Sequence, residues 1–165
     1  MTTQQELMVR MGELATSATI GDVLVTIGLG SCIGVALVDA RRPIVGLAHV
    51  MLPESTNAAG PVAKFADTGV PELARAVRAE GAARLEAVIV GGAQMFSFGG
   101  EEGANIGARN VAAVRAELDR LRIPIRAAAT GGRKGRTVRV HVDGARVTVR
   151  EVAGTEEELY GRGTP

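Results

Sequence analysis

The residues of this chain that could do chemistry gather in a short glycine-rich stretch, GLGSCIG, at positions 28–34. It contains the only cysteine of the sequence, Cys32, with apolar runs on both sides. A lone cysteine is commonly a small core residue. Here, however, glycines permit a sharp bend that can leave the amides of Ser31 and Cys32 outside any strand pairing. Such amides can stabilise an oxyanion, so the stretch predicts a nucleophilic thiol, with Gly30 and Ser31 in the oxyanion-binding turn.

A nucleophilic cysteine needs a base, and the sequence offers two histidines. His141 lies beside Arg139, on the expected charged face of a hairpin. His49 lies in the strand-like segment GLAHVMLP, 17 positions after Cys32. If the neighbouring strands pair, Cys32 and His49 come within hydrogen-bond reach. We therefore expect His49 to lower the pKa of the thiol and to form a thiolate–imidazolium pair with it.

A third group should hold the imidazole in the productive tautomer. Spacing alone does not identify this group. The candidates near enough in sequence are Asp22, Asp39, Thr26, Ser31 and Asn57.

Composition excludes several classes of partner. The chain has 165 residues, a net charge of +1 and only 2% aromatic residues. A near-neutral charge does not attract phosphate backbones and few rings are available for base stacking, so no nucleic acid partner is expected. A single cysteine cannot form an internal disulfide, which favours a reducing compartment. No signal peptide or bilayer-spanning run is visible, so we expect a cytoplasmic protein without membrane insertion, and neither a cofactor nor a metal.

The elements that must position these residues follow from the hydrophobic pattern. Strands are expected at 7–11, 13–16, 23–29, 33–39, 44–52, 85–93 and 124–129. They are followed by a hairpin, TVRVHV and ARVTVR, whose Asp143-Gly144 pair suits a type I′ turn. Helices are expected at 71–80, with Pro71 at the first helical position, and at 106–121, capped by Asn105.

About ten strands are too many for one small sheet. The pattern therefore predicts an α+β fold with two packed mixed β-sheets and helices on the outside. We expect a single domain over 1–165, with its core at about 7–150. Residues 153–165 are expected to form a loose tail.

These stretches also resemble a known family, the chemoreceptor glutamine deamidases called CheD. The resemblance covers roughly residues 10–150, with the blocks in family order. The matching blocks are TIGLGSCIGVALVD (26–39), GLAHVMLPES (46–55), KFAD (64–67), VGGAQMF (90–96), NIGARNV (105–111) and GGRKGRTVRVHVDG (131–144). Two departures lie outside the proposed catalytic positions. Phe65 replaces a common Tyr, and Pro71 falls where the family continues a helix.

The resemblance implies a fold, an activity and a catalytic triad. The fold is an α/β/β/α sandwich similar to the deamidase domain of cytotoxic necrotizing factor. The activity converts glutamine side chains of methyl-accepting chemotaxis receptors to glutamate, with release of ammonia through a cysteine thioester. Some relatives are also credited with receptor methylesterase activity. By position, the triad falls on Cys32, His49 and Thr26, and the implied regulatory partner is CheC, a phosphatase of phosphorylated CheY.

Thr26 is a weaker orienting group than a carboxylate. Its oxygen can accept the Nδ1 hydrogen bond and fix the tautomer, but it offers no negative charge to stabilise an imidazolium. We therefore expect a less basic histidine than in a carboxylate triad.

Three other interpretations compete with catalysis on a protein amide. A non-catalytic chemotaxis adaptor could bind a receptor or CheC through the same groove. A small-molecule thiol hydrolase or a nucleotide binder is another possibility, although the glycines at 28, 30 and 34 only approach a dinucleotide fingerprint and precede a strand. The GGRKGR loop at 131–136 could bind an anion, and the loop at 97–104 could be a flap beside the substrate.

Overall fold

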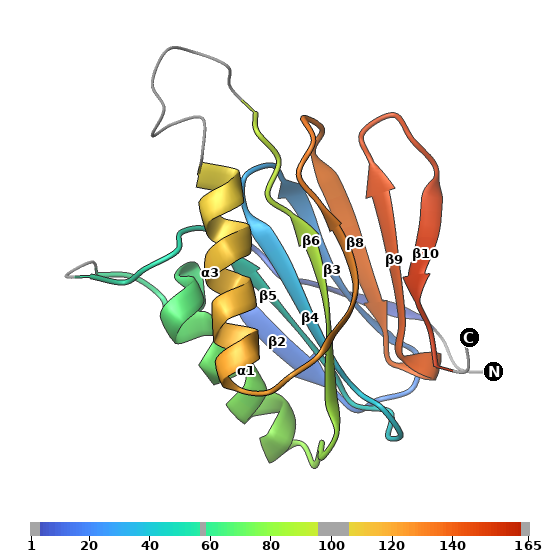
Figure 1. Ribbon diagram of the computed structural model, residues 1–165. Helices are drawn as coiled ribbons and strands as arrows, with labels where there is room; N and C mark the ends of the chain where they lie inside the picture. The colour runs from blue at the N-terminus through green and yellow to red at the C-terminus, as the bar shows by residue number, and fades with distance from the viewer. Residues whose placement is uncertain (1–3, 57–58, 96–105, 163–165) are drawn as a thin grey trace.

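The computed structural model describes residues 4–56, 59–95 and 106–162, which form two mixed five-stranded sheets with helices (Figure 1). Sheet A has the order β1-β3-β8-β9-β10. Its strands are Gln5–Met8, Asp22–Leu29, Arg136–His141, Arg146–Glu151 and Glu156–Tyr160. Sheet B has the order β2-β5-β4-β6-β7. Its strands are Leu14–Ser17 (β2), Val45–Val50 (β5), Ile33–Asp39 (β4), Leu85–Gly91 (β6) and Ile125–Thr130 (β7).

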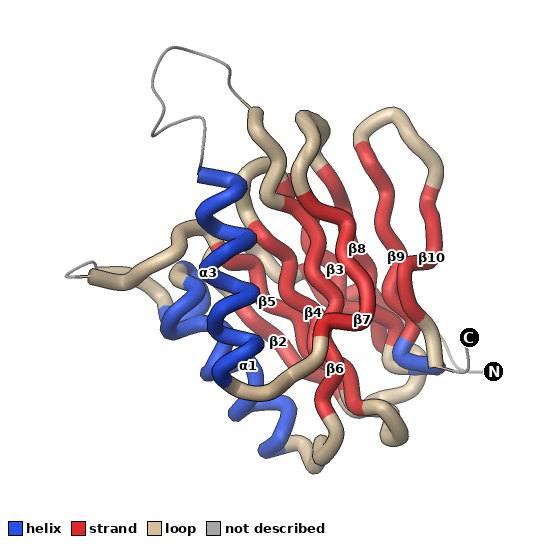
Figure 2. Tube along the Cα trace, viewed as in Figure 1, coloured by secondary structure: helices blue, strands red, loops and turns tan. Residues whose placement is uncertain are grey.

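Two helices cover one face of sheet B, namely α1 (Ala66–Ala79) and α3 (Ile106–Arg120) (Figure 2). The short 3-10 helix η1 (Val62–Lys64) leads into α1. The apolar stripe of α1 packs against the same face as α3, because burying an amphipathic surface drives a helix onto a sheet. No helix in the described part of the chain is long and apolar enough to cross a membrane.

The second face of sheet B packs against sheet A. Valine and leucine side chains from both sheets form this inner core, including Leu47, Val88, Val138 and Val140. Every residue of β4 and β5 is buried, so the central strands of sheet B are covered on both faces. The predicted α+β fold with two packed mixed sheets is therefore confirmed.

Within the described residues, the helices that flank the sandwich lie on one side of it. Both α1 and α3 lie on sheet B, which gives the order helices, sheet B, sheet A. Strand β8 alternates buried valines with less buried polar residues such as Arg139 and His141. An antiparallel sheet with this alternation can face water on one side, so sheet A needs no helix to cover it.

Three local expectations also differ from the structure. The segment expected as a loose tail contains β10, which pairs antiparallel with β9. Helix α1 begins at Ala66 rather than at Pro71, because the buried apolar face of the helix offsets the hydrogen bond that an internal proline loses. Asp143-Gly144 is not a two-residue turn but part of the 3-10 helix η2 (Asp143–Ala145), with a φ of 72° at Gly144.

The expected flap at 97–104 and the expected cap at Asn105 lie outside the described residues.

Asp39 ties together the end of the sandwich farthest from the cysteine turn. Its buried carboxylate accepts hydrogen bonds from the backbone amides of Arg41, Arg42, Ala83 and Arg84. Although burial works to raise the pKa of Asp39, these four bonds dominate and lower it to about 2. The carboxylate thus joins the loop after β4 to the loop before β6.

We expect Asp39→Ala to lower the free energy of unfolding by at least about 3 kcal/mol, because several buried amides lose their acceptor. Urea denaturation at pH 7 measures this loss, with the exposed Asp119→Ala as the matched control. A difference of less than about 0.5 kcal/mol from the wild type would contradict the role of Asp39.

Candidate active site

His49 and Thr26 come from different sheets and meet inside the sandwich. His49 lies on β5 and shares its orientation with Leu47, which points into the core between the sheets. Thr26 lies on β3, and its Oγ1 is 2.7 Å from Nδ1 of His49. Both side chains are fully buried. The contact between these two residues, which sequence reasoning obtained only through the family resemblance, is therefore present in the structure.

The hydrogen bonds of Thr26 determine the tautomer of His49. The Thr26 hydroxyl donates its one proton to the backbone carbonyl of Val9, at 2.6 Å. Its oxygen can therefore only accept from His49, so Nδ1 carries the proton. In the neutral imidazole, Nε2 is then unprotonated. Nε2 is buried and has no hydrogen-bond partner among the described residues, which leaves it available as a base.

Cys32 lies on the same inner side as His49. Gly34 pairs directly with His49 across β4 and β5, and Cys32 precedes Gly34 by two residues. Cys32 itself lies in the bend one residue before β4 begins, at the start of the strand that pairs with β5. Cys32 is half-buried and packs against the core between the sheets. Its thiol is not hydrogen-bonded to Nε2 in this state, a gap that catalytic pairs without substrate commonly show.

Gly34 leaves the space that this arrangement needs. A Cβ atom there would lie 3.0 Å from the Leu29 side chain, 3.1 Å from Val138 and 3.4 Å from Thr26. Any larger residue would therefore press on these three side chains, and Thr26 is the one that is hydrogen-bonded to the imidazole.

The turn at 30–32 carries the chain from β3 in sheet A to β4 in sheet B, and the site lies at this crossing. The amide of Gly30 already donates to the carbonyl of Gly28, at 3.0 Å. It is therefore not free to bind an oxyanion. The amides of Ser31 and Cys32 have no acceptor within the described ranges. Of the amides in the expected oxyanion-binding turn, these two N–H groups are therefore the ones available as donors.

The electrostatics differ from the expected thiolate–imidazolium pair. Burial raises the pKa of the Cys32 thiol and lowers the pKa of His49 to about 4. At neutral pH the resting site therefore holds a neutral thiol beside a neutral imidazole. Such a pair can act by general base catalysis, in which a thiol proton moves to Nε2 as the sulfur attacks.

The low pKa of His49 makes acid stability a measurable property of the site. An unfolded histidine titrates near 6.5 and the folded one near 4, so the unfolded state binds more protons as the pH falls through this window. The stabilisation is complete above about pH 6.5 and is lost towards pH 4. We expect the free energy of unfolding to drop by about 2 kcal/mol from pH 7 to pH 5. Urea denaturation at both pH values measures the drop, and His49→Gln should remove most of it.

The raised pKa of Cys32 predicts how the thiol reacts with iodoacetamide. Only the thiolate is alkylated, so the rate should rise about tenfold per pH unit from pH 6 to pH 8. Intact mass measured over time gives the rate, with the single cysteine as the only thiol. A rate that stays constant over this range would instead mean a preformed thiolate.

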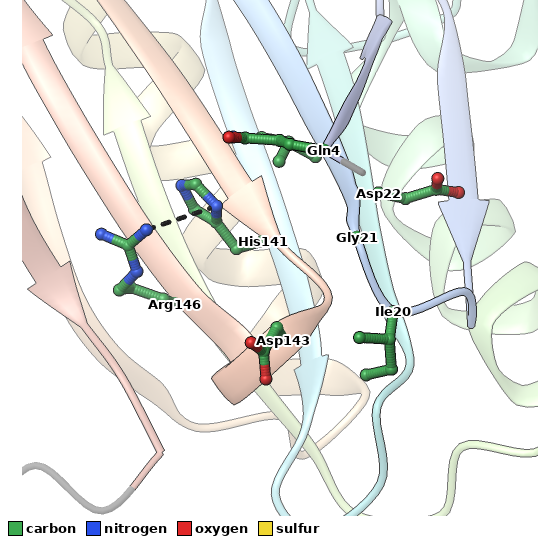
Figure 3. A pocket seen from close by; sticks show the side chains of 8 residues that line it. Gln4, Ile20, Gly21, Asp22, His141, Asp143 and Arg146 are labelled. Atoms are coloured by element: carbon green, nitrogen blue, oxygen red, sulfur yellow. Dashed lines mark hydrogen bonds between the residues drawn. The ribbon is translucent and has the colours of Figure 1, made fainter. Parts of the chain in front are cut away.

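The other histidine takes no part in this arrangement. His141 pairs with Val23 near the start of β3, whereas Cys32 follows the end of that strand. It lines a surface pocket of about 240 Å³, where Arg146 lies 3.5 Å from its Nδ1 (Figure 3). Among the remaining candidates for the third group, Asp22 accepts from Ser17, Asp39 is at the far end, and Asn57 lies outside the described residues.

Sequence reasoning missed two groups at the site. The Val9 carbonyl orients Thr26 through its backbone, for which a side-chain pattern carries no signal. Asn110 is fully buried on α3 and donates to the carbonyls of Ser31 and Met51. The sequence did contain an indication of this buried residue, because Asn110 is a polar residue within the apolar helical stripe that includes Ile106 and Val114.

Comparisons with known proteins agree on one family. A family model described as CheD chemotactic sensory transduction matches residues 51–151. A protein of Geobacillus kaustophilus named probable chemoreceptor glutamine deamidase CheD is 41% identical over 96% of this chain and 100% of its own length. The chemoreceptor glutamine deamidase CheD of Thermotoga maritima is 41% identical, over 91% of this chain and 94% of its own. A probable CheD of Haloarcula marismortui is 44% identical over 73% and 71% of the two chains.

Proposed function

Because the chain belongs to the CheD family, we propose that it deamidates glutamine side chains of chemoreceptors, with Cys32 as the nucleophile, His49 as the base and Thr26 as the orienting residue. One observation carries this proposal. The hydrogen bond between Thr26 and Nδ1 leaves Nε2 of His49 unprotonated on the face that it shares with the only thiol. The pair suits acyl transfer from an amide, and the names of the relatives identify the amide as that of a receptor glutamine.

The first half of the reaction forms a thioester. Nε2 takes the thiol proton while the sulfur of Cys32 bonds to the carboxamide carbon, which places a negative charge on the amide oxygen. The amides of Ser31 and Cys32 stabilise this oxyanion. The imidazolium then gives its proton to the amide nitrogen, and ammonia leaves because the protonated amine is a far better leaving group than an amide anion.

The second half hydrolyses the thioester. Nε2 removes a proton from water as the water oxygen attacks the acyl carbon, and the same amides hold the new oxyanion. The sulfur leaves and regains its proton from the imidazolium, so the free thiol returns. The released side chain is glutamic acid, which ionises to glutamate. Each reaction consumes one water and adds one negative charge to the receptor.

The proposal is tested with a cytoplasmic receptor fragment. The wild-type chain should release ammonia and produce the glutamine-to-glutamate mass change at specific positions, and Cys32→Ala should do neither. If both proteins bind the fragment but neither releases ammonia, the chain is a non-catalytic adaptor. Turnover of free glutamine or of a nucleotide in place of the fragment would identify a small-molecule enzyme.

Three finer points belong to the same proposal. The thioester route would also cleave methyl esters of receptor glutamates, because methanol can leave from the same tetrahedral intermediate. We propose CheC as a regulatory partner on the basis of family membership, and its effect is measured by adding it to the deamidation assay. We place the reaction in the cytoplasm, where a single unpaired cysteine stays reduced.

A further inference from the structure

The three carbonyls of the cysteine turn are all fixed by hydrogen bonds from neighbouring elements. The donors come from the end of β6 and from α3, which lies along β4 and β6 in Figure 1. The bonds are Ala93 N to Gly30 O at 2.8 Å, Asn110 Nδ2 to Ser31 O at 2.9 Å and Gly92 N to Cys32 O at 2.9 Å.

A fixed carbonyl also fixes the amide that follows it. No described peptide bond is cis, and in a trans peptide the C=O and the next N–H point in opposite directions. The carbonyl of Ser31 and the N–H of Cys32 belong to one peptide plane. The bond from Asn110 to this carbonyl therefore aims the Cys32 N–H away from α3. That N–H is one of the two amides without an acceptor among the described residues.

Asn110 differs from the other two donors, Gly92 and Ala93, because it donates from its side chain. Its amide is fully buried, and the second proton of Nδ2 goes to the carbonyl of Met51, at 3.0 Å. Met51 is the residue directly after β5, the strand that carries His49 and ends at Val50. One NH₂ group thus ties the nucleophile turn to the strand that carries the base.

We infer that Asn110 is a positioning residue that orients the Cys32 N–H as an oxyanion donor. The inference rests on the proposed function, because an oxyanion forms only if the thiol attacks a carbonyl. Without Asn110 the Ser31–Cys32 peptide plane can rotate, and the N–H no longer points to the place where charge develops. The effect falls on the transition state rather than on the binding of the substrate.

This inference predicts a separation between two reactions of the same sulfur. Deamidation passes through an oxyanion, whereas alkylation by iodoacetamide does not. For Asn110→Ala, we expect kcat on the receptor fragment to fall about 100-fold with little change in KM, because one oriented donor is lost. The rate of Cys32 alkylation should stay within about twofold of the wild type, since the thiol and its burial are unchanged.

Two further variants control for the stability of the fold. Glu117→Ala removes another buried polar side chain from α3, two turns away from Asn110, and should leave kcat at the wild-type value. Asn110→Ser replaces the two-proton NH₂ group with a hydroxyl that can donate to only one carbonyl, so its kcat should fall between those of the wild type and the alanine variant. If Asn110→Ala does not fold, Asn110→Ser is judged by the same comparison of kcat with alkylation.

Two results would overturn the inference while the wild type remains active. One is a kcat of the Asn110 variant within about threefold of the wild type. The other is a parallel loss of alkylation and deamidation, which would mean that Asn110 only maintains the pocket around the sulfur. A wild type that releases no ammonia would instead defeat the proposed function itself.

Discussion

Cys32→Ser should reduce deamidation of a receptor fragment by at least about 10³-fold, because a hydroxyl replaces the nucleophilic thiol. The neutral imidazole of His49, whose pKa is about 4, is a weak base. It can remove a thiol proton as attack proceeds, but an alcohol is far less acidic than a thiol and needs a stronger base than this imidazole. The serine variant keeps the shape of the turn, so binding of the receptor fragment should persist.

The measurement is ammonia release together with the mass of the fragment. Ser31→Ala is a matched control, because it removes a hydroxyl from the neighbouring position while keeping the backbone amides that we assign to oxyanion binding. Its rate should remain within a few-fold of the wild type. Substantial ammonia release by Cys32→Ser would show that the sulfur is not the nucleophile.

Sequence reasoning was sufficient to select Cys32 and His49, because a thiol and an imidazole are chemically distinctive side chains. A single thiol between glycines, and a histidine in the next strand but one, led to the two side chains that we propose react. Their protonation states were not predictable from residue types, because the pKa values depend on the burial of both groups between the sheets. Thr26 required the family resemblance, since a threonine in a strand is ordinary by propensity.

The wrong predictions about secondary structure also arise from tertiary contacts, because these contacts outweigh the local sequence pattern. The acidic run in β10 reads as a solvated tail, yet Glu156 accepts from Thr148 and the Tyr160 hydroxyl donates to Glu86. These bonds hold the last strand on β9 and against the neighbouring sheet. Similarly, Pro71 suggested a helix start, whereas the packed face of α1 continues through it.

Thr26→Val should lower kcat by about 10³-fold with a much smaller change in KM, because it removes the group that fixes the tautomer of His49. Valine has nearly the same shape but no hydroxyl. Nδ1 then loses its acceptor and the Val9 carbonyl loses its donor. The proton can move to Nε2, and an imidazole protonated at Nε2 cannot accept the thiol proton.

Thr26→Ser separates this effect from packing, because serine keeps the hydroxyl and loses only the methyl group, which faces the space beside Gly34. It should retain activity within about tenfold of the wild type, since both hydrogen bonds can form. Nitrogen NMR of labelled histidine reports the tautomer directly, with Nδ1 protonated in the wild type and in Thr26→Ser but not in Thr26→Val. A valine variant with wild-type kcat would mean that His49 is oriented by the strand pairing of β4 and β5 alone, and that the threonine hydroxyl is structural.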